Sequence, residues 1–599
     1  MKISRDWLQT YFEKPLPEAQ ALADALTFHA FEIESITTYD VVMPLDSVLD
    51  VKITPNRGHD CLSHRGIAKE LSAILNVPMK ADSLHGGDTI SIIPKTNAVK
   101  VHVEDSKLCP RFTGALIQGI KVGPSPEWLR VALESVGQKS INNIVDATNY
   151  IMFDIGQPLH AFDVSKIKDH KLEVKRTKKE EQFVALDDKG YALPKGTLVI
   201  ADNEHALSIA GIKGGKPTGI DEATTDIFLE AANWDGVTIR KTSQVLKLRT
   251  DASDRFQQVI SPELAVYGLR AAADLIVELA GGKIVDFVDE YPKSQEKRTV
   301  SVSTEKVNKV LGTKLADADV ADVFTRLDLL FMQKGSEFTV DVPFERLDLV
   351  IPEDLIEEVA RIVGYDKISA TELPKFSRKP EVNPSFYAAE KAREELVAKG
   401  YSEVFTSVFA EEGERAVLNK VGGEKPYLRT TLVDGLKEAC ERNTRNRDLL
   451  GLKEVKLFEI GAVWKNGKEV VMLGTADSQG VRETTLPISG DTISRYEELP
   501  TSVTEHYQPF SRYPSITRDV SLWVPVKTDP EEVLALIREG AGELLVHSEL
   551  FDTFAKGEKQ SLAFRLVFQS FDRTLTDDDA STRMESVYVA LKHKGFEIR

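Results

Sequence analysis

The chain has 599 residues, too many for a single hydrophobic core, so we expect about four or five domains. No run of about 18 apolar residues occurs, which argues against a membrane-spanning helix. The formal net charge of −18 argues against a surface that attracts nucleic acid everywhere. Three widely spaced cysteines exclude a disulfide framework and favour a reducing, cytoplasmic location.

The first 95 residues predict a mixed module. The segment EAQALADALTFHAF has helical spacing, and FEIESITTY alternates as a strand does. Residues 97–290 predict a β-rich domain with interspersed helices. SPEWLRVALESVG is expected to be a helix with Ser125 as its N-cap, and a longer helix should stop at Gly281.

Three further regions complete the predicted multidomain α+β architecture. Residues 295–370 combine strands with three short helices and resemble a winged-helix module. Residues 371–500 read as an α/β domain. Residues 506–599 have the order β-α-β-β-α-β, which is the ferredoxin-like split motif.

A polar stretch, INNIVDATNYIMFDIGQPLHAFD, raises the first functional question. Asn149, Gln157 and His160 stand among apolar residues, either as a buried brace around a turn or as the wall of a ligand pocket. The residues alone favour the brace. Downstream, Glu230 ends an apolar strand-like run in DIFLEAANWD, where its carboxylate could accept a proton from a ligand hydroxyl.

A group of carboxylates raises the second question. Asp354, Glu357 and Glu358 share one helix face, and Asp348 lies just before them. Such a set suits Mg²⁺, but Asp354 and Glu357 also fit a helix N-terminal cap, which spacing alone favours. His59, Cys61 and His64 lack a second ligand group at zinc spacing, so we interpret them as part of a helix N-terminal loop capped by Asp60 or Ser63.

Several motifs in one order resemble a known family. VDATNYIMFDIGQPLHAFD, IPEDLIEEVARIVGYDKI and RYPSITRDVSLWV followed by LFDTF and GFEIR are similar to the beta subunit of bacterial phenylalanyl-tRNA synthetase. That family implies a tetramer of two alpha and two beta chains that acts on tRNA(Phe), with synthetic chemistry in the alpha subunit. It further implies an editing domain at 97–290, a degenerate class II synthetase-like domain at 371–500 and an anticodon-binding domain at 506–599.

The resemblance also assigns individual residues. Glu230 matches the glutamate that recognises the tyrosine hydroxyl when Tyr-tRNA(Phe) is hydrolysed. Thr148, Asn149 and His160 match the polar wall of that editing pocket, and Ala210 with its neighbouring glycines matches the floor. Mg²⁺ ligands are implied at Asp348, Asp354, Glu357 and Glu358.

The chain also departs from the family pattern. An oligonucleotide-binding insert is missing near residues 37–50, Lys213 stands where an apolar residue is common, and VKLFEIGAVW lacks an ATP-binding arginine. In the last domain, contacts with RNA are expected from Tyr513, Arg518, Trp523, Arg565 and Arg573, whereas Phe510, Phe551 and Phe564 are expected in the core.

Two alternative functions stay open. A free-standing hydrolase of mischarged tRNA would need the pocket but neither the carboxylate group nor the synthetase-like domain. A non-enzymatic assembly subunit would have lost Glu230 or His160.

Overall fold

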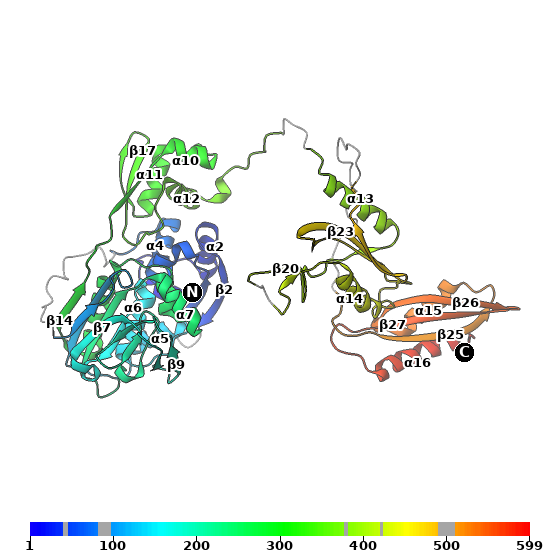
Figure 1. Cartoon of the computed structure of the whole chain (residues 1–599), viewed down its shortest axis with the longest axis horizontal. Coiled ribbons are helices and arrows are strands. Elements are labelled where there is room, and N and C mark those ends of the chain that lie inside the picture. The colour runs from blue at the N-terminus through cyan, green and yellow to red at the C-terminus, as the bar shows by residue number, and fades with distance from the viewer. Residues whose placement is uncertain (40–45, 82–97, 376–380, 420–422, 489–509) are drawn as a thin grey trace. The chain divides into compact units, whose positions relative to one another are not determined.

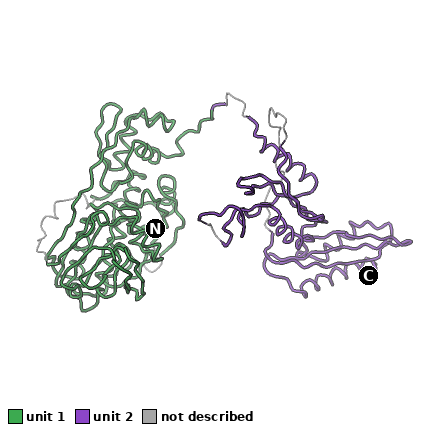
Figure 2. Tube along the Cα trace, viewed as in Figure 1, with its two compact units in different colours: residues 1–373 green, residues 374–599 purple. Residues whose placement is uncertain are grey.

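Figure 1 shows the computed structural model, which describes residues 1–39, 46–81, 98–375, 381–419, 423–488 and 510–599. The chain divides into two compact units, Met1–Leu373 and Pro374–Arg599 (Figure 2). Both units mix helices with sheets, as predicted. Among the described residues, no helix combines the length and the apolar character needed to cross a membrane.

The first unit begins with a small sheet of order β1-β3-β2. Its elements are β1 (Lys2–Ser4), α1 (Arg5–Gln9), α2 (Ala19–His29), β2 (Ile33–Tyr39), β3 (Asp46–Val51), α3 (Gly58–Cys61) and α4 (His64–Leu75). The last pair of the β2–β3 ladder joins Tyr39 to Asp46. The connection expected to lack the insert therefore centres on residues 40–45, which lie outside the described residues.

Two sheets form the middle of the first unit. One has the order β14-β5-β13-β6 and is antiparallel throughout, and the other has the order β12-β11-β10-β7-β4. Their strands are β4 (Lys100–Val103), β5 (Arg111–Gln118), β6 (His160–Asp163), β7 (Lys171–Arg176), β10 (Leu198–Ala201), β11 (Ala206–Ile209), β12 (Lys213–Gly214), β13 (Asp226–Asn233) and β14 (Lys283–Glu290). A separate hairpin pairs β8 (Glu181–Val184) with β9 (Gly190–Leu193). Both large sheets contribute side chains to one shared apolar core.

Five helices accompany these sheets, namely α5 (Glu127–Ser135), α6 (Asn143–Ile155), α7 (Gly236–Leu246), α8 (Asp251–Gln257) and α9 (Leu264–Ala280). Helices α6 and α9 pack together and share a second core with Leu229 and Ala231 of β13. Gly281 ends α9 with φ 73°, as predicted, because glycine adopts positive φ without strain. The prediction for α5 was wrong: its N-cap is Pro126, and the Ser125 hydroxyl instead donates to Asp146 at 2.6 Å.

The first unit ends in a smaller module with a sheet of order β15-β17-β16. Its elements are β15 (Arg298–Ser303), α10 (Thr304–Leu311), α11 (Asp317–Arg326), β16 (Leu330–Lys334), β17 (Glu337–Val342) and α12 (Pro352–Val363). Its apolar core contains Val302, Phe324, Phe338 and Leu355. The three helices match the prediction, but strand β16 was not predicted, because the second helix was expected to run on through Phe331 and instead ends at Arg326.

The second unit contains a sheet of order β18-β22-β23-β24 followed by one of order β26-β27-β25-β28. The elements before residue 490 are α13 (Pro384–Ala398), β18 (Ser402–Glu403), β19 (Phe409–Ala410), β20 (Arg415–Ala416), β21 (Tyr427–Leu428), α14 (Val433–Thr444), β22 (Leu457–Lys465), β23 (Lys468–Asp477) and β24 (Gly480–Thr485). The last domain has β25 (Ile516–Pro525), α15 (Pro530–Ala541), β26 (Leu545–Lys556), β27 (Lys559–Phe568), α16 (Asp577–His593) and β28 (Glu597–Ile598). This confirms the predicted β-α-β-β-α-β order.

Two core predictions in the last domain were wrong. Phe564 is fully buried, but Phe510 is 80% exposed and Phe551 is 46% exposed. Alternation along β26 explains Phe551, because Leu550 beside it packs against the core opposite Phe564 and Phe551 therefore turns to the other face.

Candidate functional site

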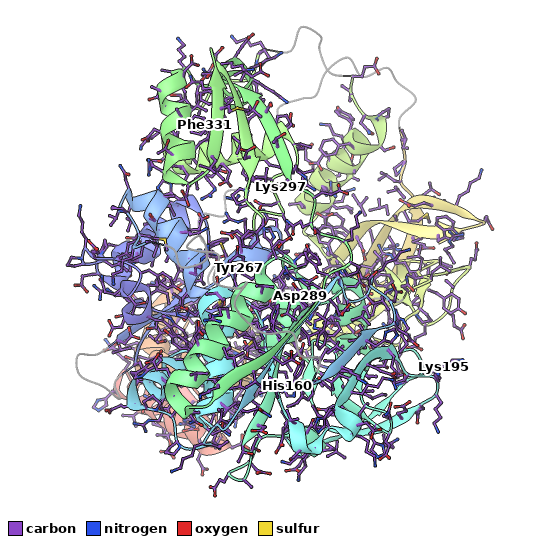
Figure 3. All side chains as sticks on the ribbon, turned by 90° about the vertical axis from the view of Figure 1, so that its left-hand side faces the viewer. His160, Lys195, Tyr267, Asp289, Lys297 and Phe331 are labelled. Carbon is purple, nitrogen blue, oxygen red and sulfur yellow. The ribbon has the colours of Figure 1, made fainter. Side chains whose placement is uncertain are left out.

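Glu230 and His160 face each other across two neighbouring strands. Strand β13 alternates, so that Leu229 and Ala231 join the core beneath the helices while Phe228 joins the core between the sheets. Glu230 therefore projects toward the core between the sheets, on the side of Phe228, where it is only 6% exposed. The β6–β13 register places His160 directly opposite it. Figure 3 shows His160 within this module.

Both side chains have strongly perturbed acidity. Burial raises the pKa of Glu230 to about 8, since no cation offsets the loss of hydration. Burial lowers the pKa of His160 to about 4. At neutral pH the carboxyl is therefore mostly protonated and the imidazole is neutral. The His160 Nε2 atom is shielded from solvent and has no hydrogen-bond partner among the described residues.

Glycine makes room for the imidazole ring. A Cβ at Gly214 would lie 2.3 Å from Cε1 of His160, so no other residue fits there without displacing the ring. Phe162 meets the other side of the ring edge-on, with 4.4 Å between ring centroids. Ala210 is buried in the same core, 1% exposed, in the turn between β11 and β12.

Cys109 is a neighbour of Glu230 that sequence reasoning missed. Its thiol is buried in the core between the sheets, and both burial and the neighbouring Glu230 raise its pKa. Its position directly before the strand β5 that pairs with β13 was the available signal.

Thr148 and Asn149 lie elsewhere. Both belong to α6, whose neighbouring residues Ala147 and Ile151 pack into the core on the opposite face of the sheet. Thr148 is buried and donates to the Val145 carbonyl at 2.7 Å. The structure therefore brings Glu230 and His160 together with the turn at Ala210. It places Thr148 and Asn149 in the helix layer on the other face of the sheet.

Gln157 is the brace that the sequence predicted. Its amide donates to the carbonyls of Pro158 at 2.9 Å and Ala232 at 3.0 Å. Gly156 precedes it with φ 92° and ends α6. Lys213, near the pocket wall, bonds with Asp187 at 2.8 Å.

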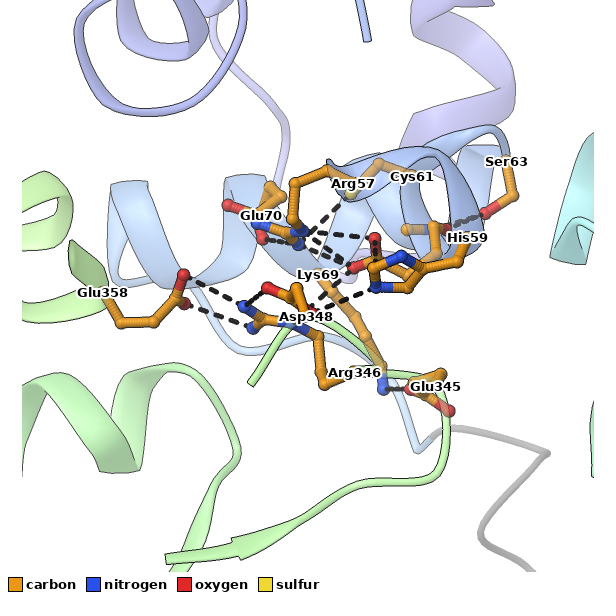
Figure 4. A network of polar contacts seen from close by, with 12 residues as sticks. Arg57, His59, Cys61, Ser63, Lys69, Glu70, Glu345, Arg346, Asp348 and Glu358 are labelled. Atoms are coloured by element: carbon orange, nitrogen blue, oxygen red, sulfur yellow. Dashed lines mark hydrogen bonds and ion pairs between the residues drawn. The ribbon is translucent and has the colours of Figure 1, made fainter. Parts of the chain in front are cut away.

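The four predicted metal ligands do not share one environment. Figure 4 shows two of them, Asp348 and Glu358, within a network of ion pairs. Asp348 bonds with Arg346 at 2.7 Å and with His59 at 3.0 Å. Glu358 is buried between Arg346 and Arg361. These ion pairs hold the pKa values of both carboxyls well below their ordinary range.

The other two carboxylates are more accessible. Asp354 caps α12 by accepting the amide protons of Val350 at 2.7 Å and Ile351 at 2.8 Å, and Glu357 is exposed. Asp348, Asp354 and Glu357 line one hollow of ≈ 400 Å³. Within the described ranges, however, the group of three potential ligands that closes to within 4.8 Å is Asp60, Cys61 and Glu70, not these acids.

The sequence interpretation of these carboxylates missed the arginines that pair with them. Arg346 and Arg361 neutralise Asp348 and Glu358, and the spacing of Arg361 three residues after Glu358 was a visible signal. Arg57 also neutralises the group of Asp60, Cys61 and Glu70, since it bonds with Asp60 and with Glu70, each at 2.6 Å.

The three residues near a possible zinc motif have separate contacts. His59 reaches Asp348, and the Cys61 sulfur accepts from Arg57 at 3.3 Å. His64 stacks on Trp7, with 3.9 Å between ring centroids. Ser63 caps α4, as one of the two predicted candidates.

In the last domain, the expected RNA-contacting residues divide between two settings. Trp523 and Arg565 stand on the sheet face opposite the core that α15 and α16 complete, where Arg565 pairs with Asp519 at 2.9 Å. Arg518 and Arg573 pair with acidic residues at the start of α16, and the Tyr513 carbonyl accepts from Gln569.

Comparison with known proteins agrees with this architecture. Four family models match the chain: the B3/4 domain at residues 108–281, the tRNA synthetase B5 domain at 300–365, the phenylalanyl tRNA synthetase beta chain CLM domain at 370–485, and the ferredoxin-fold anticodon-binding domain at 511–599. The fold is thus a mixed α/β multidomain one that ends in a ferredoxin-fold anticodon-binding domain.

Full-length relatives extend the match to most of the chain. The phenylalanine–tRNA ligase beta subunit of Moorella thermoacetica is 32% identical over 92% of this chain and 80% of that protein. That of Syntrophus aciditrophicus is 32% identical over 90% of this chain and 79% of its own. That of Geobacter metallireducens is 37% identical over 72% of this chain and 55% of its own. The chain therefore belongs to the family of phenylalanine–tRNA ligase beta subunits.

Proposed function

We propose that this chain is the beta subunit of a phenylalanine–tRNA ligase that works with an alpha subunit, in a tetramer of two alpha and two beta chains, on tRNA(Phe). ATP-dependent formation of Phe-tRNA(Phe) takes place in the alpha subunit. The beta chain contributes assembly, tRNA binding and hydrolysis of Tyr-tRNA(Phe). One observation carries the editing role: a buried carboxyl, Glu230, faces an unpartnered imidazole, His160, in an otherwise apolar core.

Glu230 distinguishes tyrosine from phenylalanine. A tyrosine ring that enters this core brings a hydroxyl that can bond with the carboxyl group. A phenylalanine ring leaves that carboxyl buried without a partner, and an unmade hydrogen bond of this kind gives large discrimination. Because Glu230 is mostly protonated at neutral pH, it can either accept from or donate to the phenol oxygen.

His160 serves the hydrolytic step. The neutral ring offers an unpartnered Nε2 that can accept a hydrogen bond from water or from the ribose of the substrate ester. Its low pKa makes it a weak base, so we assign it to orienting these groups. Attack of the water oxygen on the ester carbonyl then releases tyrosine and the tRNA 3′ hydroxyl.

We also propose a Mg²⁺ site at the hollow lined by Asp348, Asp354 and Glu357. Carboxylate oxygens suit a hard cation, which would stabilise the contact with a partner chain. Asp348 would use an oxygen that is now paired with Arg346 or His59, at the edge of the hollow. Glu358 fits the ion poorly, since Arg346 and Arg361 already neutralise it. We place it in the supporting ion-pair network.

The family models support functional boundaries close to those expected from the sequence. We propose an N-terminal module at 1–95, an editing domain at 97–290, a winged-helix-like module at 295–370, a degenerate synthetase-like domain at 371–500 and an anticodon-binding domain at 506–599. Arg565, Trp523 and Phe551, on the face of the last sheet opposite its core, suit stacking and phosphate contacts with single-stranded RNA. There Arg565 would exchange its pairs with Asp519 and Asp448 for phosphate.

Glu230→Ala in the complex with the alpha subunit tests the editing role. We expect Phe-tRNA(Phe) formation to stay unchanged while Tyr-tRNA(Phe) accumulates, as measured by aminoacylation with each amino acid. Lys195→Ala, an exposed change in the same module, is the matched control. Unchanged hydrolysis of Tyr-tRNA(Phe) would refute the assignment, and a chain that purifies alone and supports no Phe-tRNA formation would refute the subunit role.

A further inference from the structure

A second cavity lies away from the Glu230–His160 pair. It has a volume of ≈ 730 Å³ and is bounded by the N-terminal module, the end of α7, one face of α8 and residues Val136, Gln138 and Phe153. Its lining carries five basic side chains against four acidic ones, in a chain whose net charge is −18. The basic residues are Lys2, Lys52, Lys247, Arg249 and Arg255.

Arg255 is the unusual member of this group. Its side chain is 2% exposed and stacks over Phe153, 4.6 Å from the ring centroid. Nε donates to the Leu62 carbonyl at 3.0 Å and Nη1 to the Asp251 carbonyl at 2.9 Å, while Nη2 reaches only the Met1 sulfur at 3.9 Å. Burial lowers the pKa of Arg255 to about 10, so it is still charged at pH 7.

Among the described residues, no carboxylate forms a hydrogen bond with this guanidinium, although Asp251 pairs with it at longer range. The Asp251 carboxylate oxygen is 3.9 Å from Nη1, beyond hydrogen-bond distance, and that side chain is 47% exposed. A buried guanidinium without a bonded anion is costly, and the protein usually supplies a partner. Arg255 is one of the residues that line the cavity.

Most of the other charges around the cavity are already paired. Arg249 bonds with Asp254 at 2.7 Å, and Lys52 bonds with Glu32 at 3.0 Å. Lys2 and Lys247 form no ion pair among the described residues and are exposed at the rim. Two free ammonium groups at the mouth and one guanidinium inside form a funnel that attracts an anion.

We propose that this cavity binds the phosphate of a nucleotide, with Arg255 as the anion-binding group and Lys2 and Lys247 at its entrance. Its volume accommodates a nucleotide rather than only a small ion. A guanidinium can give a phosphate two parallel hydrogen bonds, which matches the donors that Arg255 leaves unused. Two sources share this chemistry: a free nucleotide and the single-stranded 3′ end of tRNA.

The structure favours the RNA strand. Thr250, between the cavity residues Arg249 and Asp251, donates to the Ile212 carbonyl at 2.9 Å. The loop that contains Ile212 also carries Ala210, which is buried in the core between the sheets, and leads to Gly214, which packs against the His160 ring. The segment Arg249–Asp251 therefore lines the cavity and also holds the loop that packs against His160. This choice of source rests on the proposed function, whereas phosphate binding does not.

Direct binding to the full chain tests the proposal. The probes are a fluorescently labelled RNA ending in CCA and, separately, ATP, with affinity measured by anisotropy and calorimetry. We expect Arg255→Met, which keeps length and removes charge, to weaken binding about ten- to a hundredfold. Lys247→Ala should weaken it less, in a manner that fades as salt is raised. Lys195→Ala, outside the cavity, should have no effect.

The outcomes distinguish a free nucleotide from the tRNA 3′ end as the source of the phosphate. They also separate this phosphate site from the proposed editing role. Binding of the RNA that needs Arg255 supports the tRNA source, and equal Arg255-dependent binding of ATP supports a free nucleotide. If neither probe binds, or if Arg255→Met binds as the wild type does, the site does not exist. Should Arg255→Met fail to fold, Arg255→Lys and Lys247→Ala decide by the same criterion. No arm measures Tyr-tRNA(Phe) hydrolysis, so a failure of the editing role leaves the result intact.

Discussion

Glu230→Gln should stabilise the module around β13, and the effect should depend on pH. The unfolded side chain has a pKa near 4.5, whereas in the folded chain the pKa is about 8. Because folding raises the pKa of Glu230, ionisation of this group does not lower the free energy of unfolding below pH 4.5. The loss of stability then grows as the pH rises from 4.5 to 8. At pH 7 it is about 3 kcal/mol, from 1.36 kcal/mol for each of roughly 2.5 pH units. Glutamine removes this cost because it cannot ionise.

Hydrogen exchange measured by mass spectrometry is the suitable assay, since a chain of several domains has no single free energy of unfolding. In peptides that cover β13 and β6, Glu230→Gln should slow exchange about a hundredfold at pH 7 relative to the wild type. At pH 5 the two proteins should differ by less than about fivefold. A ratio that is the same at both pH values would refute the claim that Glu230 is protonated in the folded chain. Peptides from the second unit serve as the internal control.

Three further predictions concern the neighbouring features. Gly214→Ala should displace the imidazole ring and lower Tyr-tRNA(Phe) hydrolysis at least about tenfold with unchanged Phe charging, and normal hydrolysis would contradict the tight contact. Arg346→Met should cost about 3–5 kcal/mol in thermal unfolding of the first unit, because it leaves buried carboxylates without their partner. Lys306→Met, which breaks an exposed pair, should cost less than about 1 kcal/mol, and equal losses would contradict the network. Glu357→Gln should weaken calorimetric Mg²⁺ binding about tenfold, and unchanged affinity would exclude the proposed hollow.

Elements with a regular apolar period were predictable because helix and strand periods are local properties of the chain. The order β-α-β-β-α-β of the last domain and strand β13 followed from them directly. Errors arose where a single neighbour decided the outcome. Ser125 is a good N-cap by type, yet its hydroxyl is engaged by Asp146, and Phe551 faces outward because Leu550 beside it packs into the core. The contact of Ser125 with Asp146 leaves no periodic trace in the sequence.

The sequence by itself determined that Glu230 and His160 are chemically out of place in apolar strands, and it placed four acids near the start of one helix. Only the tertiary structure decided which of these meet. Strand register brought Glu230 opposite His160, and helix packing put Thr148 on the other face of the sheet. Ion pairs with Arg346 and Arg361 hold Glu358 in a buried position. The physical reason is that burial and pairing, which set the charge and the hydrogen-bonding capacity of a side chain, depend on neighbours that are remote in the chain.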